Sequence, residues 1–307
     1  MTARPTLGRL LPSLAFAAVA TLAQPALAAE ITIPHAQGEL KLADTPKTVL
    51  VFDLASLDTL DALGVEVQGV PKGVKPPSLA KFASDKYLAI GTLFEPDYEA
   101  VSAAKPDLII VGGRSAAKYA DLAKIAPTID MTVDREHFLD SVRKNATTLG
   151  AVFGKEKEAA EKLAALDASV AALREVTPGA GRGLIVLTTG GRMSAYGPGS
   201  RFGLIHDGFG IQPAVEKLDQ GNHGQAISHE FILETNPDWL FVIDRDVAIG
   251  KGDAAEKFLD NEIVGQTEAW KKKQVVYLDP ASWYLIGGGL TALQSSVDQI
   301  RGALSKS

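Results

Sequence analysis

The chain has 307 residues, of which 46% are hydrophobic and 22% charged, and its formal net charge is -6. This composition is that of a folded globular protein and excludes a disordered, collagen-like or coiled-coil chain. Without cysteine there is no disulfide, no Cys-ligated metal centre and no thiol nucleophile. The acidic balance gives no support to a nucleic-acid partner, because such domains present a basic face.

The first residues have the layout of a secretory signal. Arg4 and Arg9 precede an apolar stretch at 14–23, and a site of small residues ends at Ala28. That stretch is about half of the roughly 20 residues that a membrane-spanning helix needs. We predict a signal peptide over residues 1–28 whose removal leaves the chain in the periplasm, a buried N-terminal helix being the alternative. Because no cysteine stands at the cleavage site, we expect no lipid anchor.

Beyond the signal, short apolar runs alternate with helix-length segments. The runs lie at 48–52, 65–70, 108–111, 184–187, 239–243 and 275–278. Helices are expected at 54–63, 115–125 and 290–304. Continuous apolar runs between helices are typical of strands that are buried on both faces of a sheet. The pattern predicts an α/β fold.

Residues 155–176 have the periodicity of a single amphipathic helix. Pro178 and Gly179 mark its end. The apolar positions recur at steps of three and four and are Ala159, Leu163, Leu166, Val170 and Leu173. One helix of this length spans about 33 Å, the width of a domain. We predict that it joins an N-terminal lobe (29–154) to a C-terminal lobe (177–307). The alternative is an ordinary amphipathic helix within one domain.

A weak internal repeat relates the two predicted lobes. Four landmarks recur at a constant offset and are Glu99, Pro106, Asp107 and Arg114 in the first copy, and Glu230, Pro237, Asp238 and Arg245 in the second. Each copy predicts a helix with a Glu near its start, a turn, a strand, and an Arg at the carboxyl end of that strand. Ligands of open α/β sheets bind at that end. Two such arginines indicate an anionic ligand between the lobes, unless the match is coincidental.

Catalytic motifs find little support in the sequence. The Gly-rich run at 197–203 has the spacing of neither a nucleophile elbow nor a dinucleotide-binding loop. It predicts a loop that approaches a ligand with Arg201 as a third cation, or else a plain turn with a solvated Arg. The histidine spacings do not favour a zinc site. His223 lies in a Gly-flanked polar loop, from which it either projects into a cleft or is simply solvated.

Near the C-terminus, Trp283 and Tyr284 stand just before three consecutive glycines. Adjacent aromatic residues at such a junction indicate either a ligand contact or two core side chains that fill the end of the sheet.

Several stretches resemble the periplasmic ferric-siderophore-binding proteins of the helical-backbone (class III) group, nearest to the branch that serves enterobactin-type catecholates. They are residues 91–99, 105–114, 194–203, 222–225, 242–246 and 277–289. The resemblance runs from about Thr48 to the C-terminus, and the run from Tyr196 to Arg201 is its most specific part. It implies two Rossmann-like α/β lobes joined by one long backbone helix, the fold of class III periplasmic binding proteins.

The resemblance also implies roles for individual residues. Arg114, Arg201 and Arg245 would line the cleft and neutralise an anionic iron chelate. His223 and Tyr284 would bind ferric iron directly when the siderophore supplies only four donor atoms. One surface glutamate per lobe docks on the permease in this family, and Glu99 and Glu230 match those positions.

The resemblance therefore implies a monomeric, non-enzymatic carrier that delivers a ferric siderophore to an ABC importer. It implies no intrinsic cofactor, because ferric iron arrives within the chelate. Two alternatives remain open at this point. One is a carrier of haem, cobalamin or a ferric hydroxamate on the same fold. The other is a periplasmic siderophore esterase, for which Ser200 or Ser228 near His223 would be the loose candidates for a nucleophile.

Overall fold

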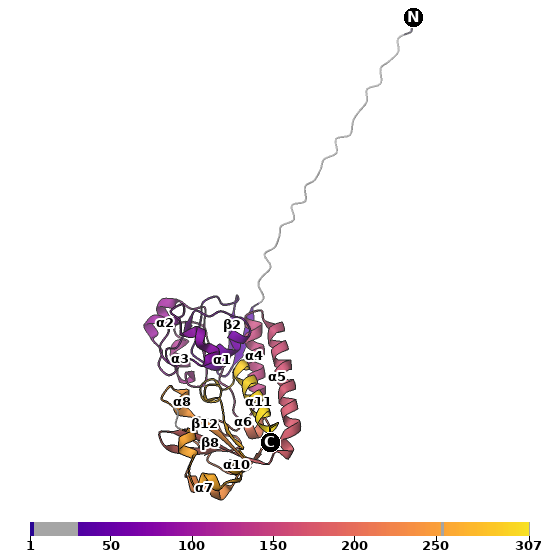
Figure 1. The fold of residues 1–307 in the computed structure, drawn as a ribbon. Coiled ribbons are helices and arrows are strands. Elements are labelled where there is room, and N and C mark those ends of the chain that lie inside the picture. Colours follow the sequence, from indigo (N-terminus) through magenta and orange to yellow (C-terminus); the bar gives the residue numbers. More distant parts are fainter. Residues whose placement is uncertain (3–29, 253–254, 307) are drawn as a thin grey trace.

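The computed structural model describes residues 1–2, 30–252 and 255–306, so the predicted signal peptide lies outside the described residues except for its first two. The chain forms two α/β halves stacked end to end, the N-terminal half in indigo and purple and the C-terminal half largely in orange (Figure 1). Each half contains its own sheet, and long helices run beside both halves along one side of the molecule.

The N-terminal half is built on a parallel sheet of strand order β5-β4-β3-β6-β7. Its strands are β3 (Val49–Val51), β4 (Gly69–Val70), β5 (Leu88–Ala89), β6 (Leu108–Val111) and β7 (Thr128–Asp130). An antiparallel hairpin precedes it, formed by β1 (Ile31–His35) and β2 (Gly38–Leu42). The accompanying helices are α1 (Leu54–Ala62), η1 (Pro77–Ala83), α2 (Tyr98–Ala104), η2 (Ala116–Lys118) and α3 (Tyr119–Leu122). The central strands β3 and β6 are wholly buried, as their apolar sequences predict.

The C-terminal half has a mixed sheet of order β11-β9-β8-β12-β13, with β10 beside β8. Its strands are β8 (Arg182–Thr189), β9 (Arg192–Tyr196), β10 (Gln212–Pro213), β11 (Gln225–Ile227), β12 (Trp239–Asp244) and β13 (Val275–Tyr277). Its shorter helices are η3 (Thr177–Gly179), α6 (Leu204–Asp207), α7 (His229–Thr235), α8 (Arg245–Ala248), α9 (Ala255–Leu259), η4 (Val264–Gln266) and α10 (Glu268–Lys271). Strands β9 and β11 run antiparallel to their neighbours.

The antiparallel strands and one helix depart from the sequence predictions. The turn between β8 and β9 is made by Gly190 and Gly191, both at positive φ. A Gly-Gly pair between β-rich runs is a hairpin signal, and the predicted elements did not include this hairpin. The helix expected at 115–125 is instead the short pair η2 and α3. The run at 65–70 contributes a strand only at its last two residues.

Helix α5 (Glu156–Val176) packs against both α4 (Phe138–Val152) and α11 (Leu290–Leu304) at the side of the molecule (Figure 1). Four of the five apolar positions predicted for α5 are buried, and Leu163 is partly buried. The helix begins one residue later than the sequence pattern suggests and ends at the same residue. It runs past both halves, which accords with the connecting role predicted for it.

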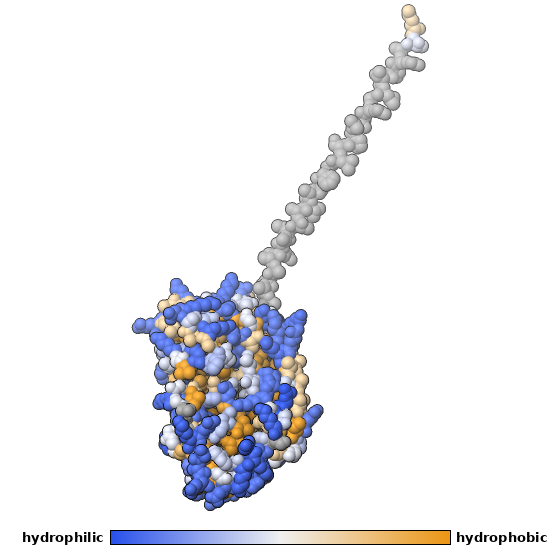
Figure 2. Space-filling view, in the orientation of Figure 1, coloured by the Kyte–Doolittle hydropathy of each residue, from blue (hydrophilic) through white to orange (hydrophobic). Residues whose placement is uncertain are grey.

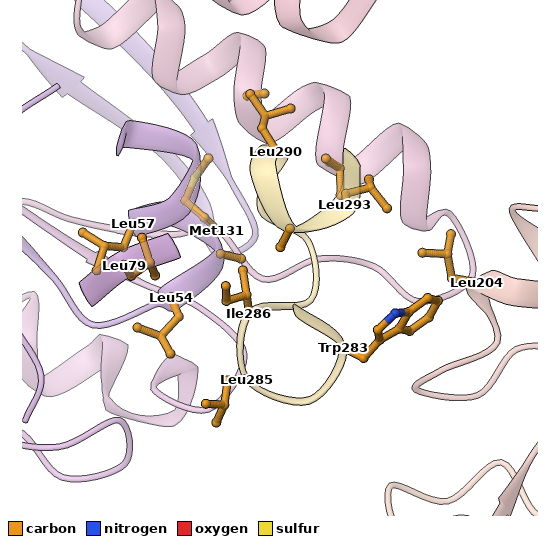
Figure 3. Packing of buried hydrophobic residues seen from close by; sticks show 14 of the residues in the cluster. Leu54, Leu57, Leu79, Met131, Leu204, Trp283, Leu285, Ile286, Leu290 and Leu293 are labelled. Atoms are coloured by element: carbon orange, nitrogen blue, oxygen red, sulfur yellow. The ribbon is translucent and has the colours of Figure 1, made fainter. Parts of the chain in front are cut away.

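The segment η5 (Ala281–Ile286) lies between the two halves and packs into both. Figure 3 shows Leu285 and Ile286 on the side of Leu54 in the N-terminal half, while Trp283 lies toward Leu204 of the C-terminal half. One apolar core cluster contains all five of these residues, so the hydrophobic core is continuous across the junction. Figure 2 shows that, on the face in view, hydrophobic residues gather around the level of β12 and β8, while both ends are hydrophilic.

A buried carboxylate joins the halves behind η5. Asp58, on α1, accepts hydrogen bonds from the backbone amides of Thr291 (2.8 Å) and Ala292 (3.2 Å) in the first turn of α11. Gly289 permits this approach, because a Cβ there would lie 2.4 Å from the Asp58 carboxylate. Asp58 is only 1% exposed, and burial raises its pKa to about 6, although the two amides act in the opposite direction.

Candidate functional site

The sequence repeat corresponds to a structural repeat. Helices α2 and α7 have seven residues each, are capped by the side chains of Asp97 and Ser228, and end at Lys105 and Asn236 in the left-handed conformation. A Pro-Asp turn then leads into β6 and β12, respectively. Because both copies end at the carboxyl edge of their sheets, the arginines that follow enter the junction from opposite halves.

Local hydrogen bonds fix the loop that carries Arg114. The amide of Gly113 donates to Thr132 Oγ1 at 3.0 Å, and the amide of Gly112 donates to Ser115 Oγ at 3.1 Å. The Thr132 hydroxyl in turn donates to the carboxylate of Asp130 at the end of β7. Neighbouring strands of the sheet thus hold the backbone from which Arg114 projects.

Three arginines converge on the ring of Tyr284. The guanidinium carbons of Arg201, Arg114 and Arg245 lie 4.5, 5.4 and 5.7 Å from the ring centroid. These separations are in the range of cation–π contacts. Arg114 comes from the N-terminal half, and Arg201 and Arg245 come from the C-terminal half. The structure therefore assembles four residues that the sequence proposed separately.

The three guanidinium groups hold different parts of η5. Arg114 donates to the carbonyl oxygen of Leu285 at 3.0 Å and also to that of Tyr284, and Arg201 donates to the Tyr284 carbonyl at 2.9 Å. Arg245 instead donates from Nε to the phenolic oxygen of Tyr284 at 2.9 Å and from Nη1 to Thr189 Oγ1 at 3.0 Å. Two arginines thus fix the backbone of this segment, and the third fixes the phenol.

The electrostatics of the cluster favour an ionised phenol. Burial alone raises the pKa of Tyr284, but the hydrogen bond from Arg245 and the charges of the three arginines outweigh it, so the net pKa is lowered. Burial, with repulsion from Arg201, lowers the pKa of Arg114. A phenol whose pKa is lowered by fixed positive charge can be an oxygen ligand for a hard metal ion, and the arginines around it can bind an anion.

His223 lies apart from this cluster. It is exposed on the loop at 219–224, and within the described residues it makes no hydrogen bond or ring contact with Tyr284 or the three arginines. Its neighbour Gly224, at φ 64°, packs against the ring of Tyr196, where a Cβ would lie 2.8 Å from the ring carbon Cζ. Tyr196 in turn is within electrostatic range of Arg201 and Tyr284. The loop therefore borders the cluster through Tyr196.

Sequence reasoning missed two side chains at this site. Thr189, which receives the hydrogen bond from Arg245, is the last residue of β8, and its position at a carboxyl strand end was an available signal. Tyr196 is buried beneath the His223 loop and belongs to the most specific resembling run, but it was given no role.

Glu99 and Glu230 occupy equivalent places in the repeat. Both are exposed in the first turn of their helices, α2 and α7, where a negative side chain is favoured. Glu230 lines a shallow surface hollow with Phe231 and Glu234. A hydrogen bond from the side chain of Ser228 lowers the pKa of Glu230, which keeps this carboxylate charged.

Comparison with known proteins identifies the family to which the chain belongs. The model of the family described as periplasmic binding protein matches residues 49–282. The chain belongs to the periplasmic binding protein family. Its fold is the class III arrangement of this family, with two α/β halves beside a long helix. In the part of the chain that the structure describes, no helix is long and apolar enough to cross a membrane.

Three members of the family are similar over nearly their whole length. The petrobactin-binding protein YclQ of Bacillus subtilis is 42% identical over 282 residues, which is 90% of this chain and 89% of YclQ. Its crystal structure matches with a TM-score of 0.87, covering 91% of this chain and 99% of that one. The periplasmic catecholate-siderophore-binding protein VctP of Vibrio cholerae has a TM-score of 0.86 at 34% identity, covering 89% and 99%. The iron-uptake ABC transporter substrate-binding protein PiuA of Streptococcus pneumoniae has a TM-score of 0.85 at 33% identity, covering 89% and 98%.

Proposed function

We propose that this periplasmic binding protein captures a ferric siderophore, of catecholate type, between its two halves and delivers it to an ABC importer. The observation that carries the proposal is the phenol of Tyr284 held among three arginines from both halves. The names of three relatives support it: YclQ binds petrobactin, VctP binds catecholate siderophores, and PiuA serves an iron-uptake ABC transporter. No observation favours a haem, cobalamin or hydroxamate cargo.

The charge of the cluster suits this ligand. Ferric catecholates are anionic and present planar aromatic rings, and a guanidinium group is always charged, donates in a plane and stacks on aromatic rings. A hydrogen bond to a charged group contributes about 1.5–3 kcal/mol. Three of them supply much of the roughly 10 kcal/mol that sub-micromolar binding requires. Arg114, Arg201 and Arg245 are therefore the proposed ligand-binding cations.

We further propose Tyr284 and His223 as direct ligands of ferric iron when the chelate has only four donor atoms. Although burial opposes it, the hydrogen bond from Arg245 and the arginine charges lower the pKa of the phenol, and a phenolate is a suitable oxygen ligand for ferric iron. His223 is exposed on a loop that borders the cluster through Tyr196, from which it would supply the nitrogen ligand. Tyr284→Phe is expected to weaken a tetradentate chelate strongly and a hexadentate one little, as measured by titration. Equal weakening of both chelates would contradict the metal-ligand role.

We propose Glu99 and Glu230 as the permease-docking residues, one per half. Their matching places in the repeat and their exposure support this role, because a two-lobed carrier needs one contact on each lobe. Glu99→Ala and Glu230→Ala are each expected to reduce uptake in cells while leaving the affinity for the chelate unchanged. Glu175→Ala, which removes an exposed glutamate of α5 away from both helices, is the matched control.

The remaining features of the proposal follow from the same role. The protein acts by binding rather than catalysis, carries ferric iron only within its chelate, and works as a periplasmic monomer after removal of residues 1–28. The lobes correspond to residues 29–154 and 177–307, with residues 155–176 as the connection.

A tryptophan-fluorescence titration tests the proposal. Trp283 is buried beside Tyr284, so a coloured chelate bound at the cluster should quench it, and Trp283→Phe should abolish most of the signal. The ligands are a ferric bis-catecholate, a ferric tris-catecholate, a ferric hydroxamate and haem. Sub-micromolar quenching by the catecholates alone supports the proposal. Tight binding of only the hydroxamate or haem would overturn the catecholate assignment, and no binding at all would overturn the siderophore role.

A further inference from the structure

A polar contact bridges the two halves beside His223. Arg135, in the segment between β7 and α4 of the N-terminal half, donates from Nη2 to Asn222 Oδ1 at 2.9 Å. Asn222 is the residue before His223 on the loop at 219–224 of the C-terminal half, which we call the His223 loop. The fourth arginine at this junction therefore contacts the loop that carries the proposed nitrogen ligand.

The His223 loop is otherwise held from its own half. Within the loop, the amide of Gly221 donates to Asp219 Oδ1 at 2.8 Å and the amide of Gly224 donates to the Gly221 carbonyl at 3.0 Å. Gln220 donates to the Pro198 carbonyl at 3.3 Å, and Gly224 rests on Tyr196. These contacts shape the loop but do not depend on the N-terminal half. Among the hydrogen bonds of the described residues, the one from Arg135 is the bond that does.

The position of Arg135 makes this contact sensitive to the separation of the halves. Arg135 and Asn222 are both exposed, so the contact lies at the rim of the junction, whereas Asp58 and the carbonyls of η5 join the halves deeper inside. Opening about the long helices moves rim residues farther than residues near the hinge. The charge of Arg135 also reaches Tyr196, which agrees with its place over the edge of the cluster.

We infer that Arg135 is a positioning residue for His223: it holds the His223 loop through Asn222 only while the two halves are close, so that His223 is presented to the metal in the closed state. This inference rests on the proposed function, because it assigns the means by which a proposed iron ligand is placed. Arg135 acts on the loop, and the chelate itself is held by Arg114, Arg201 and Arg245.

A double-mutant cycle tests the inference with the full-length mature chain. Arg135→Ala and Asn222→Ala are each expected to weaken a ferric bis-catecholate about fivefold, the effect of losing one hydrogen bond. The same variants should weaken a ferric tris-catecholate less than about twofold, because a hexadentate chelate needs no protein ligand. The double variant should be no weaker than either single variant, since both remove the same contact. Arg301→Ala, which removes an exposed arginine that donates to Asp298 on α11, is the matched control.

The visible charge-transfer band of the bound bis-catecholate gives a second readout. It should shift in the same direction in Arg135→Ala, Asn222→Ala and His223→Ala, because all three lose or misplace the same metal ligand. An Arg135→Ala effect that persists in the Asn222→Ala background would overturn the inference and make Arg135 a direct contact of the chelate. Equal effects on both chelates, or no effect, would also overturn it. If the wild-type chain binds neither catecholate, the proposed function itself fails, which is a different result.

Discussion

The two copies of the internal repeat place an arginine at the same point and use it differently. Arg114, after β6, donates to two backbone carbonyls of η5, a segment that belongs to the other end of the chain. Arg245, after β12, donates to the phenol of Tyr284 and to Thr189 within its own half. The first arginine ties the halves together, and the second sets the ionisation of the phenol. Equivalent positions in a duplicated fold therefore need not share a task.

Removal of Arg114 should have the largest effect on stability. Arg114→Ala leaves the carbonyls of Tyr284 and Leu285 without these donors, and we expect a loss of about 2–3 kcal/mol in the free energy of unfolding. Urea unfolding of the variant measures it. Arg245→Ala should cost less, about 1 kcal/mol, because the hydroxyls of Tyr284 and Thr189 that lose its hydrogen bonds belong to partly exposed residues and can bond to water instead. Equal losses of stability in the two variants would contradict the proposal that Arg114, and not Arg245, holds the two halves together.

The buried carboxyl group of Asp58 should make the free energy of unfolding depend on pH. The pKa of Asp58 is about 6 in the folded chain against its usual 3.8, so the folded state holds an extra proton between these values. Stability is therefore greatest below about pH 4 with respect to this group and falls as pH rises toward 6, by about 1.4 kcal/mol per pH unit at most. Unfolding of the wild type and of Asp58→Asn across this range should show a slope that the variant lacks. A wild-type slope unchanged in the variant would assign the effect to another group.

Removal of Arg245 should change the pKa of Tyr284 more than it changes the stability of the fold. In Arg245→Leu, the pKa of Tyr284 should rise, because its hydrogen bond and a positive charge are lost while burial remains. The tyrosinate absorbance of the variant measures this, with Tyr284→Phe as the blank. Each unit of increase should lower the neutral-pH affinity for a tetradentate ferric chelate about tenfold, because the metal must displace a more firmly held proton. Arg114→Leu should raise the pKa less, since it donates no bond to the phenol.

The smallest difference expected between the copies lies in their Pro-Asp turns. Asp107 accepts from the amides of Lys47 and Thr48, at 2.9 and 2.8 Å, whereas Asp238 accepts from the amide of Arg182 at 2.8 Å and forms an exposed ion pair with its guanidinium at 3.9 Å. We expect Asp107→Ala to cost about 1–2 kcal/mol and Asp238→Ala about 1 kcal/mol or less. Thermal unfolding of the two variants compares them directly. A larger loss in Asp238→Ala would show that hydrogen-bond number does not decide the cost.

The sequence predicted the elements better than their relations. Helix α5, helix α11 and the central strands follow from periodicity and apolar runs, because burial selects those residues directly. The arginines at strand ends followed from the repeat. The partner of each arginine did not, because Arg114 and Arg245 stand at the same position of the repeat and yet meet different parts of η5. Such partners are brought together by tertiary packing, which no local pattern encodes.

The Asp58 contact links residues that are 233 positions apart in the chain. Helix α11 and η5 are the last elements to be synthesised, yet they complete the core of the half that is synthesised first. Contacts of such sequence separation close slowly and cannot form on a nascent chain that has not yet been finished. The N-terminal half thus reaches its final packing only after the C-terminus is made, so a chain that is still being synthesised cannot complete the fold of that half.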